Sequence, residues 1–199
     1  MAVILKAAIR ALDRLLRATL GVFEFCDAPH CLLRLRVARA PHPLTLPGEV
    51  VPEGALILEL HLWNEHIPPM PPTGPDLAWA VQIQRQLIGS MRAVAALMVS
   101  DPRLAEVQAV GGVTVLLWPG RDIGGEKLFQ HLGFTISPYH SPLGRFGEFW
   151  ENLYSWWIMW AFNPATLQGR QLLRLQRVEV WMSTAALLER YATDGERRQ

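Results

Sequence analysis

Residues 55–66 read ALILELHLWNEH, an apolar run that ends abruptly in polar side chains. The residues alternate in the way that a half-buried β-strand requires. One face carries Leu56, Leu58, Leu60 and Leu62, and the other carries Ile57, Glu59, His61 and Trp63. The next segment, HIPPMPPTGP, is rich in prolines that block both helices and strand pairing, so we expect the strand to end near residue 63 and a rigid loop to follow.

The polar residues at the end of this strand are the first candidates for a functional site. In open α/β sheets, ligands bind where the chain leaves the carboxyl end of a strand. We therefore predict that His61, Asn64 and Glu59 bind a ligand, and that Glu65 or His66 serves as the catalytic base if the protein is an enzyme. The alternative is that these side chains only satisfy the backbone groups of the loop.

The segments around this strand predict one α/β domain with a mixed sheet. CLLRLRVARA alternates over residues 31–40, and VQAVGGVTVLLW and FTISP read as two further strands. Between them we expect a long helix over residues 77–99 that is capped by Asp76, and a short helix, EKLFQHL, that ends at Gly133. The connection PHPLTLPGEVVPEG is expected to be rich in turns.

The last third of the chain is rich in tryptophan. GRFGEFWENLYSWWIMWAF, residues 144–162, keeps helical spacing and carries no charge after Glu151. Such a helix is either buried or seated at a membrane or partner surface, with Trp156 and Trp160 as the predicted contacts. From Thr166 to Tyr191 the chain is rich in arginine and leucine, and we expect a further helix that includes a short strand at RVEVW.

The N-terminal residues predict an amphipathic basic helix. Its basic residues recur every three or four positions and interrupt every hydrophobic run, so a signal peptide is not expected. The helix either docks on the domain core or lies on anionic lipid, and in the second case Arg10 and Arg14 contact the membrane.

Composition narrows the classes of function. The formal net charge of +1 over 199 residues gives no indication of nucleic-acid binding. Cys26 and Cys31 form a single C-x4-C pair, which leaves a turn with two thiols or a local disulfide and does not predict a metal site. No nucleotide fingerprint is present, so no cofactor is expected. Arg121, in the loop PGRDIGG, is the remaining predicted ligand contact, because it could bind an anion before the short helix.

We expect the whole chain, residues 1–199, to form a single domain. Its parts are the basic helix over 1–22, the α/β core over 31–137, and the aromatic and Arg/Leu-rich helices over 143–192. No spanning segment is expected, which favours a cytoplasmic protein that is peripheral on the inner membrane.

Two families resemble parts of this chain. The element order, and the turn formed by Leu132, Gly133 and Phe134, resemble the later half of a GNAT acyl-CoA N-acyltransferase over residues 31–137. That superfamily holds the CoA pyrophosphate with a glycine-rich loop, whereas HIPPMPPTGPDLAW stands at this position here. Several of its residues are prolines, which have no N–H to donate, so the resemblance implies a lost activity or a different ligand.

The second resemblance is to the YkoP-like domain family and runs over residues 10–165. It rests on the LxLHLWNE strand, SDPRLAEVQAVGGVT, FQHLGFTI and the later aromatic helix. The family's matching strand end holds a histidine and an asparagine, which correspond to His61 and Asn64. The association of that family with bacterial polysaccharide deacetylases implies a cell-envelope setting, but the metal-binding motifs of a deacetylase are not present in this sequence.

Together these patterns favour a bacterial binding or accessory protein of envelope lipid or glycan metabolism at the inner membrane surface. The expected partners are an anionic membrane and a lipid or glycan ligand. Two alternatives stay open. One is a GNAT-like acyltransferase that uses an acyl-thioester donor. The other is an interaction module whose Trp-rich helix contacts a partner or a second copy of the chain. Whether the protein is an enzyme is left open by the sequence.

Overall fold

The computed structural model describes residues 2–115, 126–168, 170–175 and 177–192. The helices are α1 (Ala2–Leu20), α2 (Leu77–Ser100), α3 (Glu126–His131), α4 (Gly144–Phe162) and α5 (Thr184–Tyr191). The strands are β1 (Leu33–Arg39), β2 (Leu44–Leu46), β3 (Glu49–Val51), β4 (Leu56–Leu62), β5 (Ala109–Val115), β6 (Thr135–Pro138) and β7 (Arg177–Ser183).

The main sheet has five strands in the order β1-β4-β5-β7-β6. β4 and β5 run parallel, joined by α2, and the other neighbours are antiparallel. This arrangement confirms the predicted α/β class and the mixed sheet. β2 and β3 form a separate hairpin.

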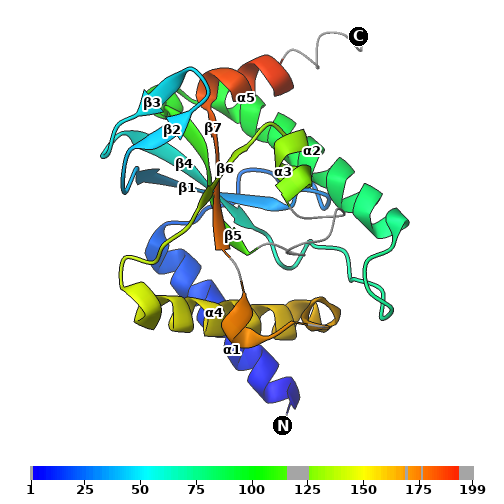
Figure 1. Cartoon of the computed structure of the whole chain (residues 1–199). Coiled ribbons are helices and arrows are strands. Elements are labelled where there is room, and N and C mark those ends of the chain that lie inside the picture. The colour runs from blue at the N-terminus through cyan, green and yellow to red at the C-terminus, as the bar shows by residue number, and fades with distance from the viewer. Residues whose placement is uncertain (1, 116–125, 169, 176, 193–199) are drawn as a thin grey trace.

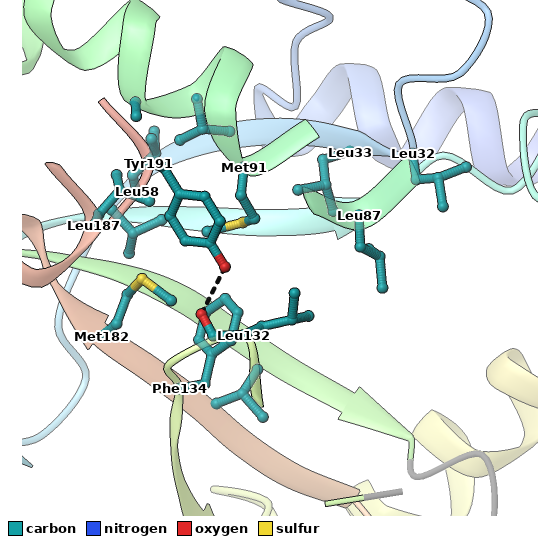
Figure 2. Packing of buried hydrophobic residues seen from close by; sticks show 14 of the residues in the cluster. Leu32, Leu33, Leu58, Leu87, Met91, Leu132, Phe134, Met182, Leu187 and Tyr191 are labelled. Carbon is teal, nitrogen blue, oxygen red and sulfur yellow. Dashed lines mark hydrogen bonds between the residues drawn. The ribbon is translucent and has the colours of Figure 1, made fainter. Parts of the chain in front are cut away.

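The alternation predicted for residues 56–62 is confirmed by the packing of β4. Leu58 and Leu60 face a core that α2 and α5 cover on one side of the sheet. Ile57 faces the opposite side and packs with Trp181 beneath the β2–β3 hairpin. Figure 2 shows the first core, where the Tyr191 hydroxyl donates a hydrogen bond of 2.7 Å to the Leu132 carbonyl oxygen and so ties α5 to the end of α3.

Helix boundaries followed local sequence signals closely. The Asp76 carboxylate accepts a hydrogen bond from the Trp79 backbone N–H at 2.7 Å, so the predicted N-cap of α2 is confirmed. Gly133 follows α3 with a φ of +96°, a conformation that favours glycine, which confirms the predicted helix stop.

Two predictions about local structure were wrong. The segment from Thr166 to Tyr191 is not mainly a helix, because among its described residues only Thr184–Tyr191 is α-helical. The short strand predicted at RVEVW is confirmed, since residues 177–183 form β7, an inner strand of the sheet. Six consecutive β7 residues are buried, so packing against neighbouring strands outweighs the helical preference of the Arg/Leu-rich sequence around it. The second error is an omission, because no strand was predicted within the turn-rich connection PHPLTLPGEVVPEG, where β2 and β3 form a hairpin.

Gly111 is required by the packing of the sheet. A Cβ atom at this position would lie 2.0 Å from the carbonyl oxygen of Val180 on the neighbouring strand. The glycine therefore lets β5 and β7 approach one another beside Trp181.

Helices α1 and α4 pack on each other and lie apart from α2, α3 and α5 (Figure 1). Ile9 of α1 is buried against Ile158 and Ala161 of α4. We call these two helices the α1–α4 layer. They lie near the end of the sheet where β4 and β5 finish and β7 begins, the end at which Val115 and Arg177 are paired.

Candidate functional site

A cavity of about 450 Å³ lies between the α1–α4 layer and the carboxyl ends of β4 and β5. Residues at the ends of both strands line it, from Leu60 to Leu62 on β4 and from Gly112 to Val115 on β5. The N-terminal half of α2 forms another wall, and α1 and α4 supply side chains that include Leu16 and Ile158. The volume falls in the range that small-molecule sites occupy in proteins, roughly 300–1,000 Å³.

The cavity wall is mainly apolar and carries a few polar groups. Leucine, isoleucine, methionine, valine and phenylalanine side chains make up most of it, and the charged residues among the lining are Asp13, Arg17, Arg170 and Arg177. This combination suits a ligand with a long apolar part and a single polar end.

Asp13 is buried in the wall, with only 3% of the residue exposed. Its Oδ1 accepts a hydrogen bond from the Tyr154 hydroxyl at 2.8 Å, and its Oδ2 lies 2.9 Å from Nε of Arg17. Burial, and then the carboxylate of Asp13, raise the pKa of Tyr154, so the phenol stays protonated and keeps donating at neutral pH. The Tyr154–Asp13 hydrogen bond thus fixes α1 to α4.

Arg177 is the first residue of β7, and only 13% of its side chain is exposed. Its Nη2 donates to the Ser155 hydroxyl at 2.8 Å and its Nε to the Asn152 side-chain oxygen at 3.2 Å. The Glu151 carboxylate lies 3.5 Å from Nε. Burial lowers the pKa of Arg177 from its ordinary value, while Glu151 and Tyr139 oppose that change.

The predicted ligand residues at the end of β4 lie at or beside the cavity. His61 and Asn64 both line it. Glu59 does not, because its carboxylate pairs with Arg36 of β1 at 3.0 Å, and it also lies 3.4 Å from Nε2 of His61. The structure therefore brings His61 and Asn64 together at one site, and Glu59 contacts His61 without lining the cavity.

The two residues predicted as a general base have partners within the protein. The Glu65 carboxylate lies 3.3 Å from Nη2 of Arg17 and 3.2 Å from Nη1 of Arg34. The His66 ring stacks on Trp63 with 3.8 Å between ring centroids, and its Nδ1 lies 2.9 Å from the Cys31 carbonyl oxygen. These contacts join the loop after β4 to α1 and to the start of β1.

Helix α1 does not dock on the protein through its apolar side. Its buried residues are Ile9 and Asp13, with Arg17 partly buried beside them. Its large apolar residues face outward, with Ile4 76% and Leu15 60% exposed. The helix therefore packs through a face that is largely polar and leaves an apolar face uncovered by the described residues.

The two arginines predicted to contact a membrane differ in their surroundings. Arg10 is exposed, yet it donates a hydrogen bond of 3.0 Å to the Ala161 carbonyl oxygen and lies over the Phe162 ring. Arg14 is exposed and makes no hydrogen bond or ion pair with the described residues.

The four tryptophans of α4 differ in their exposure to solvent. Trp156 and Trp160 are partly buried, and the Lys6 ammonium lies 5.1 Å from the Trp160 ring centroid. Trp150 and Trp157 are more exposed, at 51% and 40%. Phe146 and Phe149 are exposed too, so the outer side of α4 continues the aromatic surface beyond the two tryptophans selected from the sequence.

Three other predictions have simpler outcomes. Arg121 and its loop lie outside the described residues. Cys26 and Cys31 are free thiols, not a disulfide, and burial raises the pKa of Cys31. Within the described ranges, no group of three or more histidine, cysteine or acidic residues could hold a metal ion, and no helix is long and apolar enough to cross a membrane.

Two functional candidates were missed in the sequence. Tyr154 and Arg177 acquire their roles from partners far along the chain, at Asp13 and Ser155 respectively. The only local signal for Arg177 was its place at the start of RVEVW, where an arginine precedes an alternating apolar segment.

A second hollow, of about 530 Å³, lies at the other end of β4, beside Leu56 and Gln108. Two of its polar groups take part in the fold, because Arg39 donates to the Gly54 carbonyl oxygen and the Gln108 backbone N–H donates to the Leu56 carbonyl oxygen, and its lining holds few apolar side chains. The apolar cavity is therefore the stronger candidate site.

Comparison with known protein families gave a match over most of the chain. The model of the YkoP domain family matches residues 6–191. No curated protein matches the chain. No solved structure matches it. The matched region includes the sheet, α1 from Lys6 onward, α4 and the cavity between them, and it extends the resemblance seen in the sequence to nearly the whole chain. The chain belongs to the YkoP domain family.

Proposed function

We propose that this chain is a peripheral membrane protein of bacterial envelope lipid or glycan metabolism, which binds a lipid-derived ligand at the inner membrane surface. The observation that carries this proposal is the apolar cavity of about 450 Å³ under a pair of helices whose outer sides are themselves apolar. A ligand with a long apolar tail fits such a cavity, and it reaches the cavity most directly from a membrane.

The outward side of α1 supports membrane contact. Val3, Ile4, Leu12 and Leu15 are exposed there, and Arg14 flanks them. A helix with this pattern lies flat in the headgroup region, with its apolar side inserted and its arginines near lipid phosphates. Transfer of each large apolar side chain contributes roughly 1–2 kcal/mol, less than full burial in a protein core.

The aromatic residues of α4 support the same contact. Trp150 and Trp157 expose their rings on the outer side of the helix, together with Phe146. Indole rings favour the level of the lipid headgroups, where one edge is wet and the other is apolar. In this proposal, α4 is the aromatic C-terminal helical layer expected from the sequence, and it extends the surface formed by α1.

Sedimentation with vesicles tests the membrane contact. We expect the full chain to bind phosphatidylcholine vesicles that contain phosphatidylglycerol, and to bind vesicles of phosphatidylcholine alone more weakly. Ile4→Asp and Leu15→Asp should each reduce the bound fraction at least about tenfold. Val99→Asp is the matched control, because Val99 is 69% exposed on α2, outside the α1–α4 layer. Equal binding by all these proteins would refute the proposal.

An acyltransferase with a GNAT-like layout remains the alternative, because the cavity lies at the ends of two parallel strands. The structure weakens one requirement of that alternative. The loop before α2 is held to Asn163, which donates to the Pro68 carbonyl oxygen and accepts from the Met70 N–H, so these groups are not available to a pyrophosphate. Thermal stabilisation by CoA or acyl-CoA, lost in His61→Ala/Asn64→Ala, would favour the acyltransferase.

A further inference from the structure

The parallel pairing of β4 and β5 stops before either strand ends. It joins Ile57–Glu59 of β4 to Ala109–Gly111 of β5. Beyond this pairing each strand is held by its other neighbour, β4 by β1 and β5 by β7. In Figure 2 the ribbons of β4 and β5 separate toward their arrowheads. We call residues 60–62 and 112–115 the unpaired strand ends, and all of them line the cavity.

The alternation of hydrogen bonds along β4 decides which of its backbone groups face β5. The Trp63 N–H donates to the Leu32 carbonyl oxygen in the register of the β1–β4 pair, so odd-numbered residues of β4 face β1 and even-numbered residues face β5. The Leu56 carbonyl oxygen agrees with this rule, because it accepts from the Gln108 N–H just before β5. Leu62 therefore turns its N–H and its C=O toward β5.

On β5 the same alternation turns odd-numbered residues toward β4. The Thr184 N–H, directly after β7, donates to the Gln108 carbonyl oxygen, so the even-numbered residues that follow Gln108 face β7. Val113 therefore turns its N–H and its C=O toward β4. No other backbone hydrogen bond of the described residues involves Leu62 or Val113, and both residues are exposed. Their main-chain groups are thus open to a molecule in the cavity.

A molecule that fills the cavity must replace the water on these groups. Donors and acceptors that are covered without a new partner cost free energy, so a ligand without matching groups loses affinity. The rest of the wall is mainly apolar and supplies few alternatives. Asn64 adds an amide beside the end of β4, and its side chain makes no hydrogen bond with the described residues. The unpaired strand ends therefore select a ligand that both donates and accepts.

We infer that the ligand carries a secondary amide, which bridges the main chains of Leu62 and Val113 while its apolar tail fills the cavity. This inference deepens the proposed function and rests on it. A trans secondary amide directs its N–H and its C=O to opposite sides, so one meets β4 and the other meets β5, as in a strand inserted between them. An ester, a tertiary amide or a carboxylate has no N–H to donate. The ligand class is a fatty acid joined to an amine through an amide bond.

The first test compares compounds that share one tail and differ at the polar group. N-methyldecanamide, N,N-dimethyldecanamide and methyl decanoate are titrated into the full chain by calorimetry, and N-methylacetamide is the tail-free control. We expect N-methyldecanamide to bind at least about fivefold more tightly than the other two tailed compounds, because only it donates a hydrogen bond. N-methylacetamide should bind weakly, because it lacks the apolar tail.

Amide hydrogen exchange, followed by NMR on the isotopically labelled chain, locates the ligand without any substitution. In the free chain the N–H groups of Leu62 and Val113 should exchange rapidly, whereas that of Gly112, which faces β7, should be protected. Bound N-methyldecanamide accepts from one of the two strand ends. It should slow exchange at Leu62 or Val113 at least about fivefold more than at Gly112, whose slowing reports the gain in global stability.

A proline at the protected position, Leu62 or Val113, then removes that donor. Both N–H groups face the opposite strand end, so the proline removes no hydrogen bond to β1 or β7. Alanine at the same position keeps the N–H and is the matched control. The proline variant should bind N-methyldecanamide at least about fivefold more weakly than the alanine variant. The ligand comparison and the exchange measurement use the unaltered chain, so a proline variant that does not fold leaves the test intact.

The outcomes separate the two proposals. If the three tailed compounds bind equally, or if neither N–H is protected, the amide inference is overturned and the lipid cavity stands. If none of the tailed compounds binds, the proposed function fails and the inference fails with it. If N-methylacetamide binds as tightly as N-methyldecanamide, the tail is not part of the ligand, which overturns the apolar part of both proposals.

Discussion

Replacement of Asp13 tests the orientation of α1, on which the membrane proposal depends. Asp13 is 3% exposed and makes two contacts, with the Tyr154 hydroxyl at 2.8 Å and with Nε of Arg17 at 2.9 Å. A hydrogen bond to a charged group contributes about 1.5–3 kcal/mol, and the loss of one partner from a buried ion pair costs about 3–5 kcal/mol. Arg17 keeps Glu65 as a second partner, so we expect Asp13→Ala to lower the free energy of unfolding by about 3–4 kcal/mol.

Tyr154→Phe isolates one of these contacts. It removes only the hydroxyl and leaves the Asp13 carboxylate buried without that donor, which should cost about 1.5–3 kcal/mol. In the double variant the Tyr154–Asp13 bond can be lost only once. The losses of unfolding free energy in the two single variants should therefore add up to more than the loss in the double variant. The difference, about 1.5–3 kcal/mol, is the coupling energy of this bond.

Urea unfolding at neutral pH, followed by tryptophan fluorescence, measures these changes, because the eight tryptophans include four in α4. Asp27→Ala is the control, since Asp27 is exposed and should change stability by less than about 0.5 kcal/mol. If Asp13→Ala costs under about 1 kcal/mol, or if the effects of Asp13→Ala and Tyr154→Phe simply add, then α1 does not dock through its polar side and its apolar residues are not the outer surface.

Three further predictions concern the sheet, the hairpin and the cavity. Gly111→Ala should lower the free energy of unfolding by more than about 2 kcal/mol, measured in urea, because its Cβ would lie 2.0 Å from the Val180 carbonyl oxygen. His42 has a raised pKa through its hydrogen bond to Glu179, so its contribution should be fully present below about pH 6.5 and fade as the pH rises through the raised value. That contribution should stay under about 1 kcal/mol because the ring is half exposed, and His42→Gln should flatten this part of the stability profile. Affinity for N-methylamides of fatty acids should rise about fourfold per added methylene until the cavity is full and then level off, and a series without this rise would contradict an apolar ligand site.

The parts of the fold that were predictable are those whose signals are local. The alternation of residues 56–62 and the Asp76 cap each depend on a few neighbouring residues, and both are confirmed. β7 was predicted only as a short strand within a helical segment, because its burial comes from strands on both sides, β5 and β6, which are distant in the sequence. The Arg- and Leu-rich residues around it favour a helix when taken alone.

The candidate site shows the same division. His61 and Asn64 were selected because strand ends are predictable, and both line the cavity, while their binding of a ligand stays a prediction. The arginine at the start of β7 was not found, since its importance depends on Ser155 in another element. The sequence also did not predict which side of α1 faces the rest of the protein. An apolar stripe ordinarily predicts the buried side of a helix. Here the polar side of α1 is buried instead, through a hydrogen bond between Asp13 and Tyr154, which are 141 positions apart in the sequence.

The charges of the α1–α4 layer favour a membrane over a second copy of the chain as its partner. In a symmetric dimer the same patch meets itself, so Arg10 and Arg14 of both copies would enter one contact. Both residues are exposed, and within the described residues neither forms an ion pair with an acidic side chain. Association would then bring like charges together in a place that expels water, which opposes the gain from apolar contact. Lipid phosphates reverse the sign of that effect, since each basic residue near an anionic surface contributes about 1 kcal/mol toward binding. The salt dependence follows directly: added salt should weaken binding to anionic vesicles, whereas it would strengthen a dimer held through this surface by screening the repulsion between the arginines.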